Sequence, residues 1–318
     1  MTAGRNPRTK NSMVPIAGLL LLSLLWALGA LRTDLFPQFA VSRSSRLQFL
    51  MEALTFAFIA IGATVLASVQ RMQWPHGTNP GICIASGLGL FVLPAVLVHF
   101  ASSQVSEFTR VAILSLVPVF TVAFEPHINL DREARGNRDL MAALAAVAGT
   151  LCIFPIQLPD SFGAGCAFGA LVLAAASVAA GNCWGVRAAS EAGQALAPCV
   201  AIAAGTAALG LAASAFMEGW AWDWHDFEST IAWSVAVELP GLTLLFWLMT
   251  RMTATRMSTR FLIAPLMANI AGLILLRARI GVRDWVGLLL IALSSGWLLF
   301  AREGEPEPSG SSLKFERD

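Results

Sequence analysis

Long apolar runs constrain this chain more than any other feature of its sequence. The stretches MVPIAGLLLLSLLWALGAL (13–31) and WVGLLLIALSSGWLLF (285–300) contain no charged residue. About 20 apolar residues in a helix cross the hydrocarbon core of a bilayer. Hydrophobic residues make up 56% of the 318-residue chain and charged residues 13%, whereas soluble domains have about 45–50% and about 25%. The sequence therefore predicts an all-α integral membrane protein.

The chain divides into ten apolar segments joined by mostly short connections, and we predict ten transmembrane helices. The segments lie at 13–31, 50–69, 80–99, 106–124, 139–157, 163–184, 194–216, 229–249, 259–276 and 285–301. Residues 1–12 and 302–318 remain as polar tails, and the second, rich in Pro and Ser, is expected to be disordered. No soluble domain is left over, so the protein is expected to act inside or across the bilayer.

The distribution of Lys and Arg predicts the orientation of these helices. Short loops on the cytoplasmic side carry more basic residues than loops on the other side. If the N-terminal tail with Arg5, Arg8 and Lys10 is cytoplasmic, an even number of spans places the C-terminal tail there too. We therefore expect a multi-pass protein of the inner cell membrane with both termini in the cytoplasm. The net charge of +1 gives no reason to expect a nucleic-acid partner.

The two halves of the chain resemble each other in order. The segment 137–154 and the segment 282–300 each open with an Arg-Asp pair, and Pro118 and Pro265 precede these pairs by similar distances. Five spans in each half is an odd number, so the second copy must cross the membrane in the opposite direction. This pattern predicts an inverted repeat of five plus five helices, residues 13–157 and 158–301, with a binding site near the midplane.

Prolines inside these segments are candidate hinges. A proline in a helix removes one hydrogen bond and clashes with the preceding turn, at a cost of about 3 kcal/mol. We expect bending at Pro118, Pro240 and Pro265. The alternative is that these prolines only serve packing, since membrane helices tolerate them.

Ionisable side chains within apolar segments are costly and indicate function. Glu238 lies well inside the eighth segment, two residues before Pro240, where freed carbonyls and a carboxylate suit a proton or a cation. Glu107 and Arg110 are three residues apart and can meet on one helix face. Arg110 and its counterpart Arg260 each suit an anionic group such as a substrate carboxylate. Structural ion pairing remains the alternative for all four.

Uncharged side chains complete the candidate substrate site. Trp26 and Trp184 occupy matching places in the two halves and offer flat apolar walls with one donor each. The polar candidates are Ser115, Asn182 and Asn269, although amides of this kind also join membrane helices by hydrogen bonds. Plain packing remains the alternative for the tryptophans.

On these residues the chain resembles the drug/metabolite transporter superfamily, EamA-like family. The resemblance covers roughly residues 16–301 and rests on the ten spans, the duplication, LLW at 24–26, LSLVPVFTVAF at 114–124 and LIAPLMANIAGLILL at 262–276. It implies a ten-helix secondary transporter, often an exporter of amino acids, metabolites or drugs.

We therefore expect a secondary transporter of a small molecule, working by alternating access, with proton coupling as an option and as a monomer or homodimer in the lipid bilayer. No P-loop, HExxH or GxSxG motif occurs, so we expect no enzyme activity, catalytic residue or cofactor. The five cysteines show no metal-binding spacing and are predicted to be packing residues rather than a metal site. Two alternatives stay open: a membrane enzyme acting on lipid intermediates through Asp34, Arg43, Arg46 and His225, and a non-transporting sensor.

Overall fold

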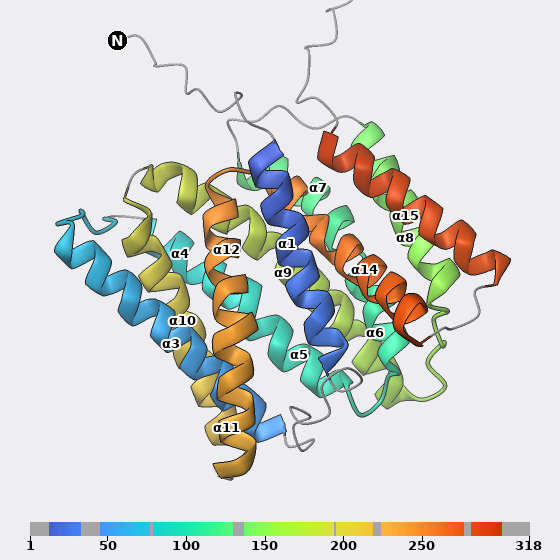
Figure 1. Cartoon of the computed structure of the whole chain (residues 1–318), viewed down its shortest axis with the longest axis horizontal. Coiled ribbons are helices and arrows are strands. Elements are labelled where there is room, and N and C mark those ends of the chain that lie inside the picture. The colour runs from blue at the N-terminus through green and yellow to red at the C-terminus, as the bar shows by residue number, and fades with distance from the viewer. Residues whose placement is uncertain are drawn as a thin grey trace, which may run out of the picture.

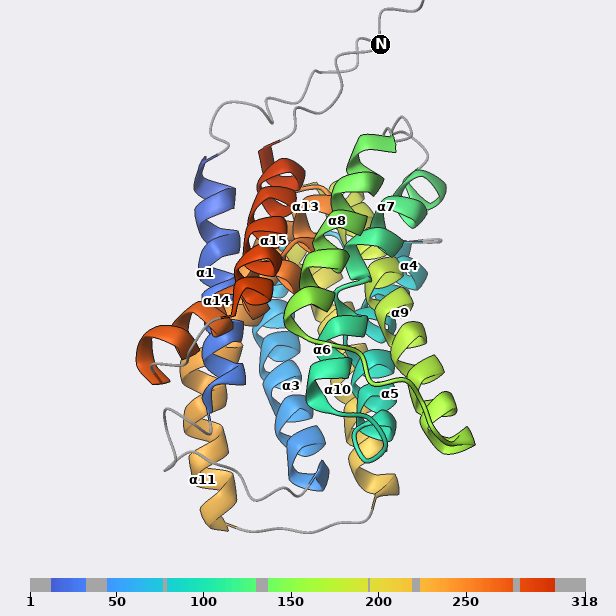
Figure 2. The ribbon, with the colours of Figure 1, turned by 90° about the vertical axis from the view of Figure 1, so that its right-hand side faces the viewer.

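The computed structural model describes residues 13–32, 45–76, 79–129, 137–193, 195–218, 224–276 and 281–300. Within these ranges every regular element is a helix, and Figures 1 and 2 show the helices gathered side by side in one bundle. Most described residues of the ten predicted apolar segments are helical. The two terminal tails lie outside the described residues.

The helices follow one another in a simple order. Two of them, η2 and η3, are single π-helical turns inside longer rods. The elements are α1 (Met13–Ala30), α3 (Ser45–Val69), α4 (Asn79–Gly87), η2 (Leu88–Val92), α5 (Leu93–Ala101), α6 (Glu107–Leu114), α7 (Val117–Ile128), α8 (Asn137–Ile153), α9 (Phe162–Ala192), α10 (Leu196–Met217), α11 (Trp224–Trp233), η3 (Ser234–Glu238), α12 (Leu239–Met249), α13 (Ala254–Ser258), α14 (Arg260–Leu276) and α15 (Val282–Phe300).

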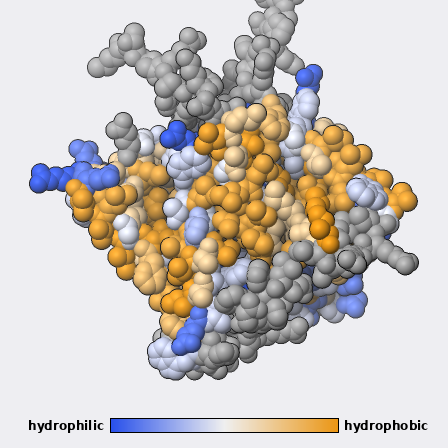
Figure 3. Space-filling model, in the orientation of Figure 1, coloured by the Kyte–Doolittle hydropathy of each residue, from blue (hydrophilic) through white to orange (hydrophobic). Residues whose placement is uncertain are grey.

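The surface of the bundle is apolar, as a protein in lipid requires. Seven helical segments of the described chain are long and apolar enough to cross a membrane, and Met13–Gly29 is a shorter apolar helix. Large hydrophobic side chains such as Phe58 and Ile61 are 61% and 62% exposed, and Figure 3 shows apolar surface over much of one face. The protein is therefore a multi-pass membrane protein. The long segments are Gln48–Val69, Pro80–Ala101, Glu107–Ile128, Phe162–Ala192, Leu196–Met217, Phe227–Met249 and Val282–Phe300.

Helices from the two halves of the chain pack closely against each other. α3 lies against α10, and α8 lies against α15. α9 contacts α4, α5 and α7, while α1 contacts α12 and α14. Glycines bring α8 and α15 together, since a Cβ added to Gly149 would lie 2.9 Å from the Gly287 carbonyl oxygen. Small residues at such crossings let the two backbones approach and gain dispersion energy.

Both π turns precede a leucine-proline pair. η2 is followed by Leu93 and Pro94, and η3 by Leu239 and Pro240. A π turn shifts the hydrogen-bond ladder by one residue, and a proline next to it has no N–H to contribute. The two features together interrupt the regular helix at one place, so Pro240 lies at an actual irregularity of its rod.

Pro118 and Pro265, in contrast, differ in their surroundings. The chain breaks at Ser115 and Leu116, and Pro118 stands in the first turn of α7, where the missing N–H has no helical partner to lose. The continuous helix expected around Pro118 is thus two helices, α6 and α7. Pro265 does lie inside a helix, α14. The break that corresponds to the one before Pro118 is at Thr259, between α13 and α14.

Candidate functional site

Arg260 is the largest side chain among those buried almost completely. It is 1% exposed and begins α14, directly after the break at Thr259. Its Nη1 donates a hydrogen bond to the Met257 carbonyl at 3.2 Å, and its Nη2 donates to Asn182 Oδ1 on α9 at 2.9 Å. The arginine therefore bridges a broken helix from one part of the sequence and the middle of α9 from another.

Two aromatic rings flank the guanidinium of Arg260. Its Cζ lies 5.1 Å from the ring centre of Trp26 on α1 and 4.9 Å from that of Phe261. The two rings meet edge to face, with centroids 5.6 Å apart. A cation over an aromatic face gains about 0.5–2 kcal/mol, so the rings replace part of the hydration that Arg260 loses by burial.

The polar groups of this site are not all satisfied. Arg260 Nε and Asn182 Nδ2 are buried and have no hydrogen-bond partner. No ion pair to Arg260 is found among the residues that the structure describes. A buried charge without a counter-ion is strongly unfavourable. The unused N–H groups of Arg260 and Asn182 could both donate hydrogen bonds to a bound anion. We call Trp26, Asn182, Arg260 and Phe261 the arginine site.

Glu238 lies in a second polar region, at η3. Its Oε2 accepts a hydrogen bond of 2.6 Å from the Ser234 hydroxyl one turn earlier. Glu238 is also within electrostatic reach of Arg32, just beyond the end of α1, and of Glu52 on α3. Arg32 stacks over the Trp233 ring at 5.0 Å. Burial lowers the pKa of Arg32, and the Glu238 carboxylate opposes this change.

A pocket of about 320 Å³ opens beside Glu238, between α3 and the rod that contains η3. Most of its lining is apolar, and Ser234, the hydrogen-bond partner of Glu238, is part of it. Its remaining lining residues are Met51, Leu54, Thr55, Phe58, Ile231, Val235 and Leu239.

The other predicted site residues lie apart from the arginine site. Glu107 is exposed in the first turn of α6, and no ion pair between it and Arg110 is found in the described part of the chain. Ser115 is buried, and its hydroxyl donates to the Ala112 carbonyl of its own helix at 2.6 Å. Asn269 likewise donates to the Pro265 carbonyl one turn earlier, at 2.8 Å. These hydroxyl and amide groups thus bond to the backbone of their own helices.

Trp184 follows Asn182 by two residues on α9, which is a rotation of about 200° around a helix. It is half-buried. The two residues therefore point away from each other, and Trp26 alone of the matched tryptophans contacts the arginine site.

One buried carboxylate did not figure among the sequence candidates. Glu125 on α7 is 3% exposed and accepts hydrogen bonds from Thr255, through the hydroxyl and through the backbone N–H at 3.3 Å. Glu125 thus caps the first turn of α13. It also connects the two interrupted helices, α6–α7 and α13–α14. Glu125 stands one residue after the predicted fourth segment, and a carboxylate so close to a helix end usually lies in water.

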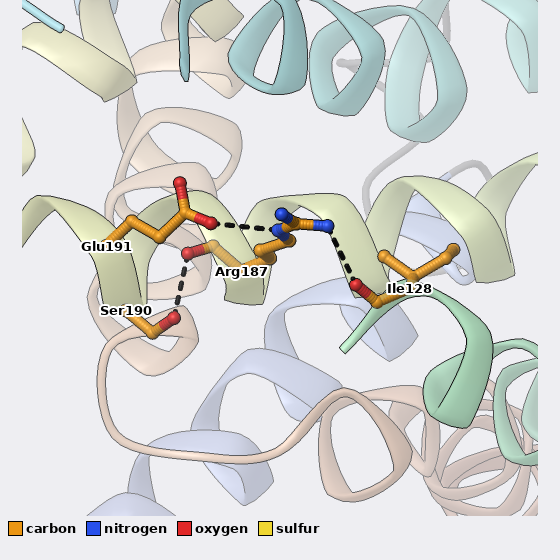
Figure 4. A network of polar contacts seen from close by, with 4 residues as sticks. All are labelled: Ile128, Arg187, Ser190 and Glu191. Carbon is orange, nitrogen blue, oxygen red and sulfur yellow. Dashed lines mark hydrogen bonds and ion pairs between the residues drawn. The ribbon is translucent and has the colours of Figure 1, made fainter. Parts of the chain in front are cut away.

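Arg187 also lies beyond its predicted segment, because α9 continues to Ala192. Figure 4 shows the arginine between two partners: Nη1 donates to the Ile128 carbonyl at 3.0 Å, and Nε donates to Glu191 Oε1 at 2.8 Å. Ile128 is the last residue of α7, where a positive charge is favoured by the helix dipole. Arg187 therefore fastens the end of α7 to α9.

The residues considered above for a membrane enzyme lie mainly outside the described part of the chain. Among the described residues, no group of three or more His, Cys, Asp and Glu side chains could hold a metal ion. Asp34 and Arg43, and the side chains of Arg46 and His225, lie outside what the structure describes.

Comparison with known proteins identifies a fold but no family. No family model and no curated protein matches the chain. Among solved structures, 29 chains match. One of them, a crystal structure of a protein, is 16% identical and superposes with a TM-score of 0.67 over 91% of this chain and 99% of its own. The chain thus shares its arrangement of helices with this protein over nearly the whole length of both.

Proposed function

We propose that the chain is a secondary membrane transporter that moves a small metabolite with an anionic group, and that Arg260 binds this group. The observation that carries the proposal is a buried arginine without a carboxylate partner in the described chain. Arg260 Nε and Asn182 Nδ2 remain available as donors. A carboxylate placed between them would neutralise the charge and satisfy both groups.

The architecture we propose is an inverted repeat of ten membrane-spanning helices. Three observations support it. The first is that α3 packs on α10 and α8 on α15, and these are corresponding helices of the two halves. The contacts of α9 with α5 and α7 have counterparts in those of α1 with α12 and α14. Both π turns stand before Leu-Pro. Such repeats commonly form carriers whose sites lie at broken helices.

The mechanism we propose follows from the position of Arg260 at a break. Arg260 is 1% exposed, so we take this arrangement to be the occluded state of the carrier, in which neither side of the membrane has access to the guanidinium. Rotation of α13 and α14 about the junction at Thr259 would carry Arg260 toward one membrane face or the other. Loss of the Asn182 hydrogen bond on opening would be offset when water or a substrate anion takes its place.

Proton coupling through Glu238 is a further part of this proposal. Glu238 accepts a hydrogen bond from Ser234, and this serine lines the pocket of about 320 Å³ next to α3. The inner-membrane placement with cytoplasmic termini rests on the distribution of Lys and Arg. Membership of the drug/metabolite transporter superfamily rests on the sequence resemblance, and both belong to the same proposal. Export of metabolites, amino acids or drugs is the corresponding direction.

The test is thermal stabilisation of the purified protein by a panel of amino acids and small carboxylates. A ligand at about 100 times its Kd stabilises the native state by about 2.7 kcal/mol. We expect an active carboxylate to raise the Tm of the wild type, and the corresponding amide or alcohol to fail. Arg260→Gln should abolish the effect.

The matched control is Arg251→Gln. Arg251 also lies over a tryptophan, Trp247, at 5.8 Å, but it is exposed at the end of α12. This variant should respond as the wild type does. Equal stabilisation of Arg260→Gln and wild type would remove Arg260 from the substrate site. Carboxylate counterflow in proteoliposomes should follow the same order and distinguishes transport from binding alone.

A further inference from the structure

Three sulfur-bearing side chains meet in one small cavity away from the arginine site. Cys83 on α4, Cys199 on α10 and Met249 at the end of α12 all line a cavity of about 20 Å³. All three are buried, with exposed fractions of 1%, 8% and 3%. They come from three different helices, so their spacing along the sequence gave no sign of a common site.

The two thiols are in direct contact. Cys83 and Cys199 pack in the same buried cluster with Ala188 of α9, and their side chains are within hydrogen-bonding reach of each other. A thiol is a weak donor and a weak acceptor, so the pair is held in place mainly by the packing of α4 on α10. The pair is therefore arranged before any ligand arrives.

Met249 reaches the cavity because α9 has a glycine opposite it. A Cβ added to Gly185 would lie 3.0 Å from Met249 Sδ and 2.8 Å from Ser86 Oγ. Gly185 thus leaves room for the thioether, and it lines the same cavity as the two cysteines. Ser86 is engaged elsewhere, since its hydroxyl donates to the Gly181 carbonyl at 3.3 Å.

The size and chemistry of the cavity select its occupant. A cavity of about 10–15 Å³ is enough for one water-sized particle, so about 20 Å³ accepts a single ion and excludes an organic ligand. Thiolates and thioethers prefer soft ions such as Cu(I). The carboxylates and imidazoles that harder ions require are absent from its lining, which otherwise consists of Ser86, Gly185, Ala188, Ala189, Leu196, Val200, Ala203 and Phe246.

We propose that Cys83, Cys199 and Met249 form a binding site for one soft monovalent metal ion of the Cu(I) and Ag(I) class. On binding, two sulfur atoms of the cysteines and one of the methionine coordinate the ion. One thiol proton leaves to solvent, because a single thiolate neutralises a monovalent cation in an apolar cavity, and no redox change occurs. Binding therefore strengthens with rising pH, with one proton released for each ion bound.

The three sulfur-bearing residues lie near the ends of their helices, so an ion would cross only a short part of the bundle to reach them. Cys83 and Cys199 lie within the first two turns of α4 and α10, and Met249 is the last residue of α12. Figure 1 shows α4 and α10 side by side. A bound ion would join α4, α10 and α12 at one end of the bundle and restrain their movement. The site is independent of the transport proposal.

Silver(I) is the probe, since it shares the ligand preference of Cu(I) without redox chemistry. We would titrate the full-length protein, purified in chloride-free detergent buffer, with Cys152 and Cys166 replaced by serine so that other accessible thiols do not compete. One equivalent of Ag(I) should bind and raise the Tm. Cys83→Ser and Cys199→Ser should each abolish the shift. Met249→Leu, which keeps the side-chain volume, should weaken binding at least about tenfold.

The matched control is Met257→Leu, a methionine that is also fully buried but lies outside the cavity. It should bind Ag(I) as the parent does, and the Tm of each variant without metal reports on its fold. Equal Ag(I) affinity in the parent and in the Cys83→Ser, Cys199→Ser double variant would overturn the proposal. Binding that is lost in both cysteine variants but unchanged in Met249→Leu would overturn the three-sulfur site.

Discussion

Both π turns are followed by a leucine-proline pair, but their surroundings are opposite. Three of the five residues of η2 are buried, namely Gly89, Leu90 and Val92, whereas Ser234 is the one buried residue of η3. The position five residues before the proline is Gly89 in one turn and Val235 in the other. Val235 is 59% exposed and lines the pocket next to α3.

The difference begins with a pair of glycines. A Cβ added to Gly89 would lie 3.1 Å from the Cα of Gly181, so η2 rests directly on the backbone of α9. At η3 a valine occupies the corresponding position, and the neighbouring space is a pocket of about 320 Å³. An irregular turn held by backbone contact cannot move alone, while one beside open space can. We infer that η3 is the more deformable of the two turns and that η2 is held in place by its backbone contact.

The strongest test of this comparison is Gly181→Ala. The new methyl group would lie 2.6 Å from Leu90 N and 2.7 Å from the Gly89 carbonyl carbon. Overpacking of this kind costs about 1–3 kcal/mol, and we expect the upper end because backbone cannot yield as a side chain can. The free energy of unfolding, measured by denaturant titration in mixed micelles, should fall by about 3 kcal/mol.

Gly169→Ala on the same helix is the control for this variant. No atom lies within 4 Å of a Cβ at Gly169, and alanine favours a helix by about 1 kcal/mol over glycine. Its free energy of unfolding should be unchanged or higher. If both variants behaved alike, the close contact at η2 would not be what fixes that turn.

A pair of serine variants compares a polar contact within η3 with one between α4 and α9, next to η2. Ser234→Ala removes the 2.6 Å hydrogen bond to Glu238, and we expect a loss of about 1.5 kcal/mol, the upper end for a single hydrogen bond. Ser86→Ala removes a 3.3 Å bond to the Gly181 carbonyl, for which about 0.5 kcal/mol is expected. The same unfolding titration applies. A larger loss for Ser86→Ala would mean that η3 depends less on its own hydrogen bond than we infer.

The smallest effect is expected when the pocket at η3 is filled. Leu54 lines the pocket and is half-buried, so Leu54→Trp can extend into open space, and we expect stability to change by no more than about 0.5 kcal/mol. Leu90→Trp at the buried η2 turn should cost about 3 kcal/mol. The thermal midpoints of the Leu54→Trp and Leu90→Trp proteins, each compared with that of the wild type, measure the two effects. A strongly destabilised Leu54→Trp would show that the pocket closes around its present side chains.

Much of the fold followed from hydrophobicity alone, because a bilayer accepts little else. Most described residues of the predicted apolar segments are helical, and the helix ends agree within a few residues except where polar groups have partners inside the bundle. α9 runs eight residues past its predicted end at 184, since Arg187 is paired with Glu191 and Ile128. The length and charge of a segment cannot reveal such pairing, because Arg187 and Ile128 are 59 positions apart in the sequence.

The candidate site was predicted in part. Trp26, Asn182 and Arg260 were each selected from the sequence, and the structure brings all three together. Ser115 and Asn269 were selected for the same polarity, but their side chains bond to their own helices. A residue's type gives its bonding capacity, whereas the choice between a helix's own carbonyl and a distant partner depends on how the helices pack. Glu125 was not predicted because its partner, Thr255, is 130 positions away in the sequence.

The bond between Glu125 and Thr255 bears on how the chain is made. The two residues are 130 positions apart. At a synthesis rate of about 5–20 residues per second, Glu125 waits on the order of 10 s before Thr255 leaves the ribosome. During that interval its carboxylate stands at the end of a newly inserted helix without its final partner. The helices up to α7 are therefore made before this group has its final partner, and the arrival of α13 supplies it.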